Sequence, residues 1–102
     1  MDIIKTRKES TLTVALSGRL DTVSAPRLEG ELRIAINGVS ELIFDLDALE
    51  YVSSAGLRVL LSAQRVMNRQ GSMVLRHVRP EIRDIFEITG FTEFLNIEES
   101  ES

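Results

Sequence analysis

The sequence predicts one α/β domain with a mixed β-sheet, in the order β-β-α-β-α-β-α-β. Two strand-like segments stand next to each other at the start, joined by a short link that suits a hairpin. Strand-like and helix-like segments then alternate, which favours parallel strands joined by right-handed crossovers. The length of 102 residues, with 43% hydrophobic and 27% charged residues, is typical of one globular domain. We expect residues 1–102 to form this domain, with residues 98–102 as a flexible acidic tail.

The first half of the chain contains the hairpin and one helix. Residues 3–7 and 11–17 are the predicted strands, and the second alternates apolar with polar side chains. A helix is predicted over residues 23–37, where Leu28, Leu32 and Ile36 belong to an apolar stripe. Pro26 fits only the first turn of this helix. Gly38 suits its C-terminal end, since glycine tolerates positive φ.

The middle of the chain contains a buried strand and a long helix. The strand predicted over residues 41–45 has three consecutive apolar side chains, as in a strand covered on both faces. Asp45 and Asp47 mark its polar end. A turn with two serines then leads into a helix over residues 54–69, which has an apolar stripe along one side.

The last third predicts a strand, a helix and a short final strand. The strands cover residues 73–78 and 94–97, and the helix covers residues 81–89, opened by Pro80. Several large apolar side chains in this region are expected to pack against the sheet. They are Ile82, Ile85, Phe86, Ile88, Phe91 and Phe94.

Composition limits the classes of function. The chain contains no cysteine, which excludes disulfides, thiol catalysis and cysteine-ligated metals. Its formal charge of −4 argues against general nucleic-acid binding, which requires a basic surface. The start of the chain lacks the features of a signal peptide, and its apolar runs are far shorter than the ~20 residues that span a bilayer. We therefore expect a cytoplasmic protein without membrane insertion.

Enzyme chemistry has little support in the sequence. A serine nucleophile needs a base, and the one histidine, His77, falls in a predicted strand. The Gly-x-Ser-x-Gly elbow and the glycine motifs of phosphate and dinucleotide sites are missing. Asp45 and Asp47 lack the further ligands that complete a metal site. We expect no enzymatic activity, cofactor or metal, and keep a small serine hydrolase or nucleotide-binding enzyme as the remote alternative.

Two adjacent serines, Ser53 and Ser54, stand where the pattern changes from strand to helix. A serine oxygen there caps the helix by accepting a hydrogen bond from a backbone N–H. The same N–H groups and the helix dipole also favour a phosphate group. The residues alone leave two interpretations open: the serines cap the helix, or one of them is a phosphorylation switch.

The segment Val52-Ser53-Ser54-Ala55-Gly56-Leu57 resembles the STAS domain, specifically that of bacterial anti-sigma factor antagonists. Other matching segments follow in the family's order along nearly the whole chain. They are Gly18 to Asp21, Leu42 to Leu46, Gly71 with Met73 to Leu75, Ile85-Phe86 and Gly90-Phe91.

The resemblance implies a protein that binds a serine-kinase anti-sigma factor and so releases the sigma factor. It also implies that this kinase phosphorylates a serine at the start of the second helix, that phosphorylation abolishes binding, and that a PP2C-type phosphatase reverses it. Placed on Gly56 and Leu57, the family's pattern puts the phosphorylated position on Ser54, with Ser53 as the alternative. Asp21 matches an acidic residue near that site in the family.

Charge repulsion explains how such a switch would work. A phosphate adds about −1.5 to −2 charge at pH 7 and would be repelled by nearby carboxylates in a complex. Arg58, one turn into the helix, is a candidate partner contact or an ordinary exposed residue. The expected partner-binding residues are Asp21, Ser53, Ser54, Gly56, Leu57 and Arg58. The alternative function is a STAS-like scaffold or transporter-associated module without a sigma-factor partner.

Overall fold

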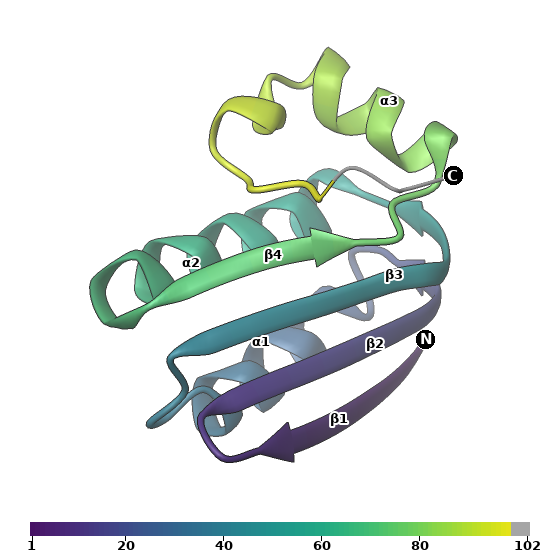
Figure 1. Cartoon of the computed structure of the whole chain (residues 1–102). Coiled ribbons are helices and arrows are strands. Elements are labelled where there is room, and N and C mark those ends of the chain that lie inside the picture. Colours follow the sequence, from purple (N-terminus) through teal and green to yellow (C-terminus); the bar gives the residue numbers. More distant parts are fainter. Residues whose placement is uncertain (99–102) are drawn as a thin grey trace.

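Four strands form one mixed sheet in the order β1-β2-β3-β4 (Figure 1). The structure, a computed structural model, describes residues 1–98. β1 and β2 are antiparallel, whereas β2 with β3 and β3 with β4 are parallel. The predicted mixed sheet is therefore confirmed. The strands are β1 (Asp2–Lys8), β2 (Thr11–Leu20), β3 (Glu41–Val52) and β4 (Ser72–Arg76).

Three α-helices complete the domain. The two helices that connect the parallel strands, α1 and α2, lie on the same face of the sheet, and the third, α3, lies beyond β4 (Figure 1). A short 3-10 helix follows α3. The helices are α1 (Ala25–Ala35), α2 (Ser54–Gln70), α3 (Pro80–Ile88) and η1 (Phe91–Glu93).

The core lies between the sheet and the helices α1 and α2. β2 supplies it by alternation, because every second side chain of a strand points to the same face. The helices supply residues three or four apart, which share one helical face. Fully or almost fully buried members are Leu12, Val14, Leu16, Leu28, Leu32, Phe44, Leu57, Leu60 and Met67.

β3 is much longer than the predicted strand of residues 41–45. The expectation that Asp45 and Asp47 mark its end was wrong, because the strand continues past both residues to Val52. Its pairing with β2 shifts register twice, between Ala15 and Ser17 and between Gly18 and Arg19 of β2. Each shift adds one residue to β3, so its simple alternation is lost.

The C-terminal part differs most from the prediction. β4 ends at Arg76 rather than at residue 78, because His77 has a left-handed backbone conformation with φ of 59°. The final strand predicted over residues 94–97 is absent from the described residues. The chain instead forms η1 and then a single parallel bridge between Ile97 and Leu75.

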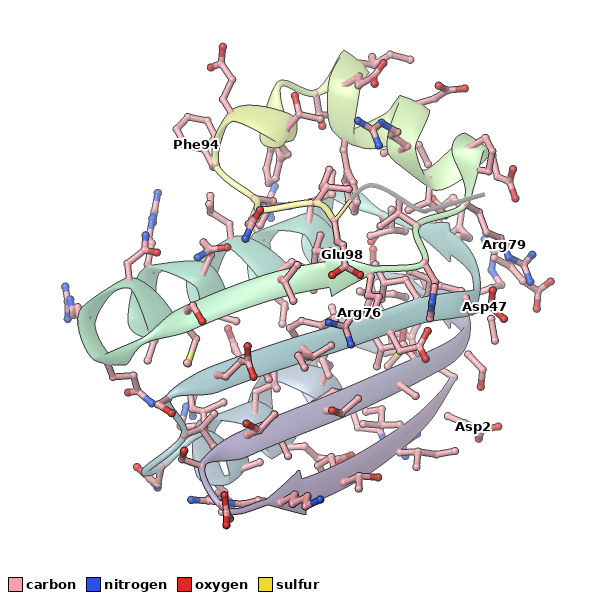
Figure 2. All side chains as sticks on the ribbon, viewed as in Figure 1. Asp2, Asp47, Arg76, Arg79, Phe94 and Glu98 are labelled. Atoms are coloured by element: carbon pink, nitrogen blue, oxygen red, sulfur yellow. The ribbon has the colours of Figure 1, made fainter. Side chains whose placement is uncertain are left out.

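Burial in this part was predicted only in part. Ile82 and Phe86 are buried as expected, whereas Ile88 is 85% exposed and Phe94 is 59% exposed. Both exposed side chains therefore correct the prediction, and Phe94 lies at the outer surface (Figure 2). Ile88 is the last residue of α3, and Phe94 directly follows η1, in the segment that a single parallel bridge joins to the sheet.

The expected acidic tail begins with a residue that is held in place. The Glu98 carboxylate pairs with the Arg76 guanidinium at 2.7 Å (Figure 2). Its backbone N–H also donates to the Leu75 carbonyl at 2.9 Å. The remaining residues of the predicted tail, 99–102, lie outside the described residues.

Candidate functional site

The serine turn lies against the end of a neighbouring strand. Because β2 and β3 are parallel, their carboxyl ends meet at the same edge of the sheet, and Leu20 pairs with Val52 there. The Ser53 N–H donates to the Leu20 carbonyl at 2.8 Å. This hydrogen bond joins the turn that starts α2 to the end of β2, directly before the turn that starts α1.

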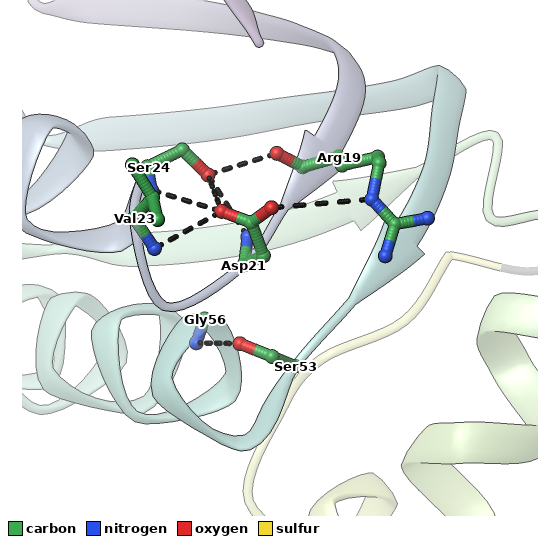
Figure 3. Close-up of polar contacts among 6 residues, drawn as sticks. All are labelled: Arg19, Asp21, Val23, Ser24, Ser53 and Gly56. Atoms are coloured by element: carbon green, nitrogen blue, oxygen red, sulfur yellow. Dashed lines mark hydrogen bonds and ion pairs between the residues drawn. The ribbon is translucent and has the colours of Figure 1, made fainter.

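Ser53 is the capping residue of α2. Its backbone is extended, with φ of −93° and ψ of 174°, as N-cap residues require. Its hydroxyl oxygen accepts from the Gly56 N–H at 3.3 Å (Figure 3). Its carbonyl accepts from the Leu57 N–H at 2.9 Å. The side chain is half-buried. Of the two interpretations that the sequence left open, the structure assigns capping to Ser53.

Ser54 is in a different situation from its neighbour. It is the first residue of α2 and its side chain is exposed. Among residues 1–98, its hydroxyl makes no hydrogen bond. The N–H groups of the first helical turn have no partner within the helix, so an anion on Ser54 would lie near unpaired donors. The Ser54 hydroxyl is thus open to solvent at a helix N-terminus.

Asp21 closes the turn that leads into α1. Its Oδ1 atom accepts from the N–H groups of Ser24, at 3.0 Å, and Val23, at 3.1 Å, and lies 3.0 Å from the Ser24 hydroxyl (Figure 3). The hydrogen bonds from Ser24, backbone first and then side chain, lower the pKa of Asp21, with smaller help from Val23 and Arg19. A charged carboxylate therefore lies one residue beyond Leu20, and the Leu20 carbonyl is the group that accepts the Ser53 N–H.

Arg19 is the residue of this region that sequence reasoning passed over. Its guanidinium carbon lies 4.1 Å from the centre of the Tyr51 ring, a cation–π contact between paired positions of β2 and β3. Its Nε is 3.9 Å from the Asp21 carboxylate. The sequence offered a signal, because Arg19 lies in the segment Gly18 to Asp21, but only the pairing of β2 with β3 shows its neighbours.

Comparison with known proteins places this geometry in a family. The STAS domain model matches residues 2–102. The chain belongs to the STAS domain family. BtrV of Bordetella bronchiseptica, a candidate anti-sigma factor antagonist by its name, is 35% identical over 102 residues, which are 98% of this chain and 88% of BtrV.

Solved STAS structures share the fold. An anti-sigma factor antagonist from Mycobacterium paratuberculosis has a TM-score of 0.86 at 22% identity, covering 97% of this chain and 86% of that one. The phosphorylated form of SpoIIAA, a Bacillus cell fate determinant, has a TM-score of 0.75 at 19% identity, covering 97% and 93%. At these identities the likeness shows the fold.

The STAS domain brings all six predicted site residues to one end of α2. Their accessibility differs, however. Gly56 and Leu57 are buried, with Gly56 packed against Leu20, so these two residues shape the turn from inside. Asp21 and Ser53 are half-buried, whereas Ser54 and Arg58 are exposed.

The serine–histidine pair that a serine hydrolase would need is not formed within residues 1–98 of this STAS domain. The His77 Nδ1 atom lies 3.1 Å from the Asp45 carboxylate, and no serine of residues 1–98 hydrogen-bonds to His77. No group of three or more histidine, aspartate or glutamate side chains in residues 1–98 is arranged to hold a metal ion. None of the helices described is long and apolar enough to cross a membrane.

Proposed function

We propose that this STAS domain is an anti-sigma factor antagonist that binds a serine-kinase anti-sigma factor and is switched off by phosphorylation of Ser54. The observation that carries the proposal is the contrast between the two serines. The Ser53 hydroxyl caps α2, whereas the exposed Ser54 hydroxyl has no hydrogen bond within residues 1–98. The phosphoacceptor is therefore Ser54, and Ser53 supports it by fixing the helix start.

The same geometry explains why phosphorylation would prevent binding without unfolding the domain. In the free domain, the N–H groups of the first turn and the dipole of α2 offset part of the phosphate charge. In a complex, the phosphate would lose its water and meet any facing carboxylate of the partner, and the nearby Asp21 carboxylate of this chain would add like-charge repulsion. A penalty of ~3 kcal/mol would weaken binding more than a hundredfold.

The proposed role requires partners but no catalytic step by this chain. The anti-sigma factor supplies the kinase, a PP2C-type phosphatase removes the phosphate, and the circuit operates in the cytoplasm. The relative BtrV supports the assignment by name, and a phosphorylated form is known for the structurally similar SpoIIAA.

A phosphorylation assay tests the acceptor. The purified chain is incubated with the kinase anti-sigma factor and ATP, and phosphopeptides are identified by mass spectrometry. We expect the phosphate on Ser54, its loss in Ser54→Ala, and its retention in Ser53→Ala. Phosphate on the Ser54→Ala variant would overturn the site assignment.

A binding assay tests the switch. Wild type, Ser54→Asp and Ser72→Asp are compared for binding to the same anti-sigma factor. Ser72→Asp is the matched control, because it adds the same charge at an exposed position of β4. We expect only Ser54→Asp to lose binding. A stable complex with a transporter, and none with any kinase anti-sigma factor, would favour the scaffold alternative.

A further inference from the structure

The arginines of α2 differ from all others in the chain. Within residues 1–98, every arginine outside α2 has a partner. Arg19, Arg27, Arg33, Arg76 and Arg83 pair with carboxylates, and Arg7 and Arg79 donate to backbone carbonyls. The three arginines of α2 have no ion pair or hydrogen bond within the same described residues, and α2 itself contains no acidic residue.

These three arginines share one face of the helix. Arg58, Arg65 and Arg69 are all exposed, and their spacings of seven and four residues return to the same side of an α-helix. Together they form the arginine stripe, which extends ~17 Å along α2 at 1.5 Å per residue. Ser54 lies four residues before Arg58, so the stripe begins at the proposed phosphorylation site.

We infer that the arginine stripe docks an acidic surface of the partner protein. The inference rests on the proposed function and adds the chemistry of the surface that is recognised. The chain has a formal charge of −4, and yet none of its described carboxylates pairs with the stripe. Unpaired guanidinium groups in a row suit carboxylates, which they bind through charge-assisted hydrogen bonds.

The net negative charge of the chain favours a protein as the partner of the stripe over a nucleic acid or an anionic membrane. Nucleic acids and anionic membranes present negative charge over a wide area, which would also meet the carboxylates of this chain. A folded protein can restrict its acidic patch to the size of the stripe. Complementary charge of this kind mainly accelerates association and suppresses wrong partners.

The stripe also gives the switch a second effect. Residues four apart on a helix are neighbours, so a phosphate on Ser54 lies within reach of Arg58. The phosphate would then neutralise the first arginine of the stripe and repel the acidic partner at the same time.

Charge reversal at the far end of the stripe tests the inference with purified anti-sigma factor. Arg65→Glu should lower the association rate constant about three- to tenfold, and Arg65→Glu with Arg69→Glu more than about tenfold. Lys8→Glu is the control, since it changes the charge equally on the sheet face away from α1 and α2. Its expected effect is less than about twofold. Arg65→Gln, which removes the charge without reversing it, should lower the association rate constant less than Arg65→Glu. Thermal melts check that every variant is folded.

A second measurement does not depend on the anti-sigma factor. Poly-L-glutamate is titrated into the labelled chain at low salt, and the arginine Nε–H signals are followed by NMR. The largest shifts should belong to Arg58, Arg65 and Arg69 and should reverse with salt. Equal shifts at the arginines outside α2, which already have partners, would overturn the inference that the stripe binds carboxylates selectively.

The outcomes separate the inference from the proposed function. If the anti-sigma factor binds wild type and the double variant equally fast and tightly, the stripe is wrong and the proposed function stands. If the anti-sigma factor fails to bind wild type, the proposed function is wrong. The poly-L-glutamate titration then decides whether the arginine stripe binds carboxylates. Tighter binding to a DNA duplex or to phosphatidylglycerol vesicles, lost in Arg65→Glu, would overturn the choice of a protein partner.

Discussion

Leu20 occupies the space that a side chain on Gly56 would need. A Cβ atom at Gly56 would lie 2.6 Å from the Leu20 Cγ and 2.9 Å from the Leu20 carbonyl oxygen, distances that real Cβ atoms do not show. The same carbonyl accepts the Ser53 N–H. The first turn of α2 can therefore approach the end of β2 only because residue 56 is glycine.

Gly56→Ala should destabilise the domain although alanine favours helices. Propensity alone would raise the free energy of unfolding by about 0.5–1 kcal/mol, but overpacking against Leu20 costs about 1–3 kcal/mol. Gly30→Ala in α1 is the control, because no atom outside its own helical backbone lies within 4 Å of a Cβ there. It should stabilise by about 0.5–1 kcal/mol. Urea denaturation measures both, and a stabilised Gly56→Ala variant would contradict the close approach.

Replacing Ser53 by alanine should destabilise the domain, whereas the same change at Ser54 should have little effect. Ser53→Ala removes the cap of α2 and should lower the free energy of unfolding by ~1 kcal/mol. Ser54→Ala removes an exposed hydroxyl without a hydrogen bond in the described structure, and its effect should stay within about 0.5 kcal/mol. Equal losses in the two variants, measured by chemical denaturation, would show that Ser54 shares the capping role.

Asp21 should make the domain more sensitive to acid. Its pKa is lowered in the folded state, mainly by hydrogen bonds from Ser24. The stability it contributes is therefore present above the pKa of an unfolded aspartate, about 4, and is lost as pH falls through the lower folded pKa. The difference in the free energy of unfolding between wild type and Asp21→Asn should be constant near neutral pH and shrink below about pH 4.

A direct titration checks the cause of that shift. Ser24→Ala removes the hydroxyl beside the carboxylate and should raise the pKa of Asp21 toward its ordinary value. NMR of the carboxyl carbon reports the pKa in both forms. An unchanged value would assign the shift to the backbone N–H groups alone.

Replacing the two glutamines of α2 by methionine should change the free energy of unfolding in opposite directions. Gln64 is 7% exposed, and its Oε1 atom has no hydrogen-bond partner within residues 1–98. Gln64→Met removes this buried acceptor but also the hydrogen bond that Nε2 donates to the Asn68 Oδ1 atom at 2.9 Å. Because Asn68 is exposed and can bond to water instead, the free energy of unfolding should still rise, by about 0.5–1 kcal/mol.

Gln70 provides the matched control. Its Nε2 atom donates to the carbonyls of Ile36 and Val39, at 2.8 and 2.7 Å, and so holds the segment between α1 and β3. Gln70→Met should lower the free energy of unfolding by about 1–2 kcal/mol. Thermal denaturation of both variants tests the pair, and a destabilised Gln64→Met would point to a partner for Oε1 in solution.

Local patterns predicted the helices and the mixed sheet well. α2 was placed almost to the residue, because an apolar stripe, a serine cap and a terminal glycine all agree there. β3 was truncated because its register shifts break the alternation that identifies a strand. The region after α3 was misread as a strand, since Phe94 is apolar yet exposed.

The site shows a similar division. Ser53 and Ser54 could be found from the chain, but only the structure separates the capping hydroxyl from the open one. The partners of Arg19 and the isolation of the arginine stripe depend on contacts between distant segments. Such contacts leave no periodic signal in one sequence.

At each of the two register shifts, two residues of β3 lie opposite one residue of β2. The extra residue is absorbed at that point, so Leu46, Leu49 and Val52 all reach the core at a spacing of three residues. Removing Asp47 alone should therefore straighten the first shift and leave Val52 in the core and Ser53 at the start of α2. Removing Glu50 as well should straighten the second. Between Asp45 and Tyr51, β3 thus carries two residues that its pairing with β2 does not need.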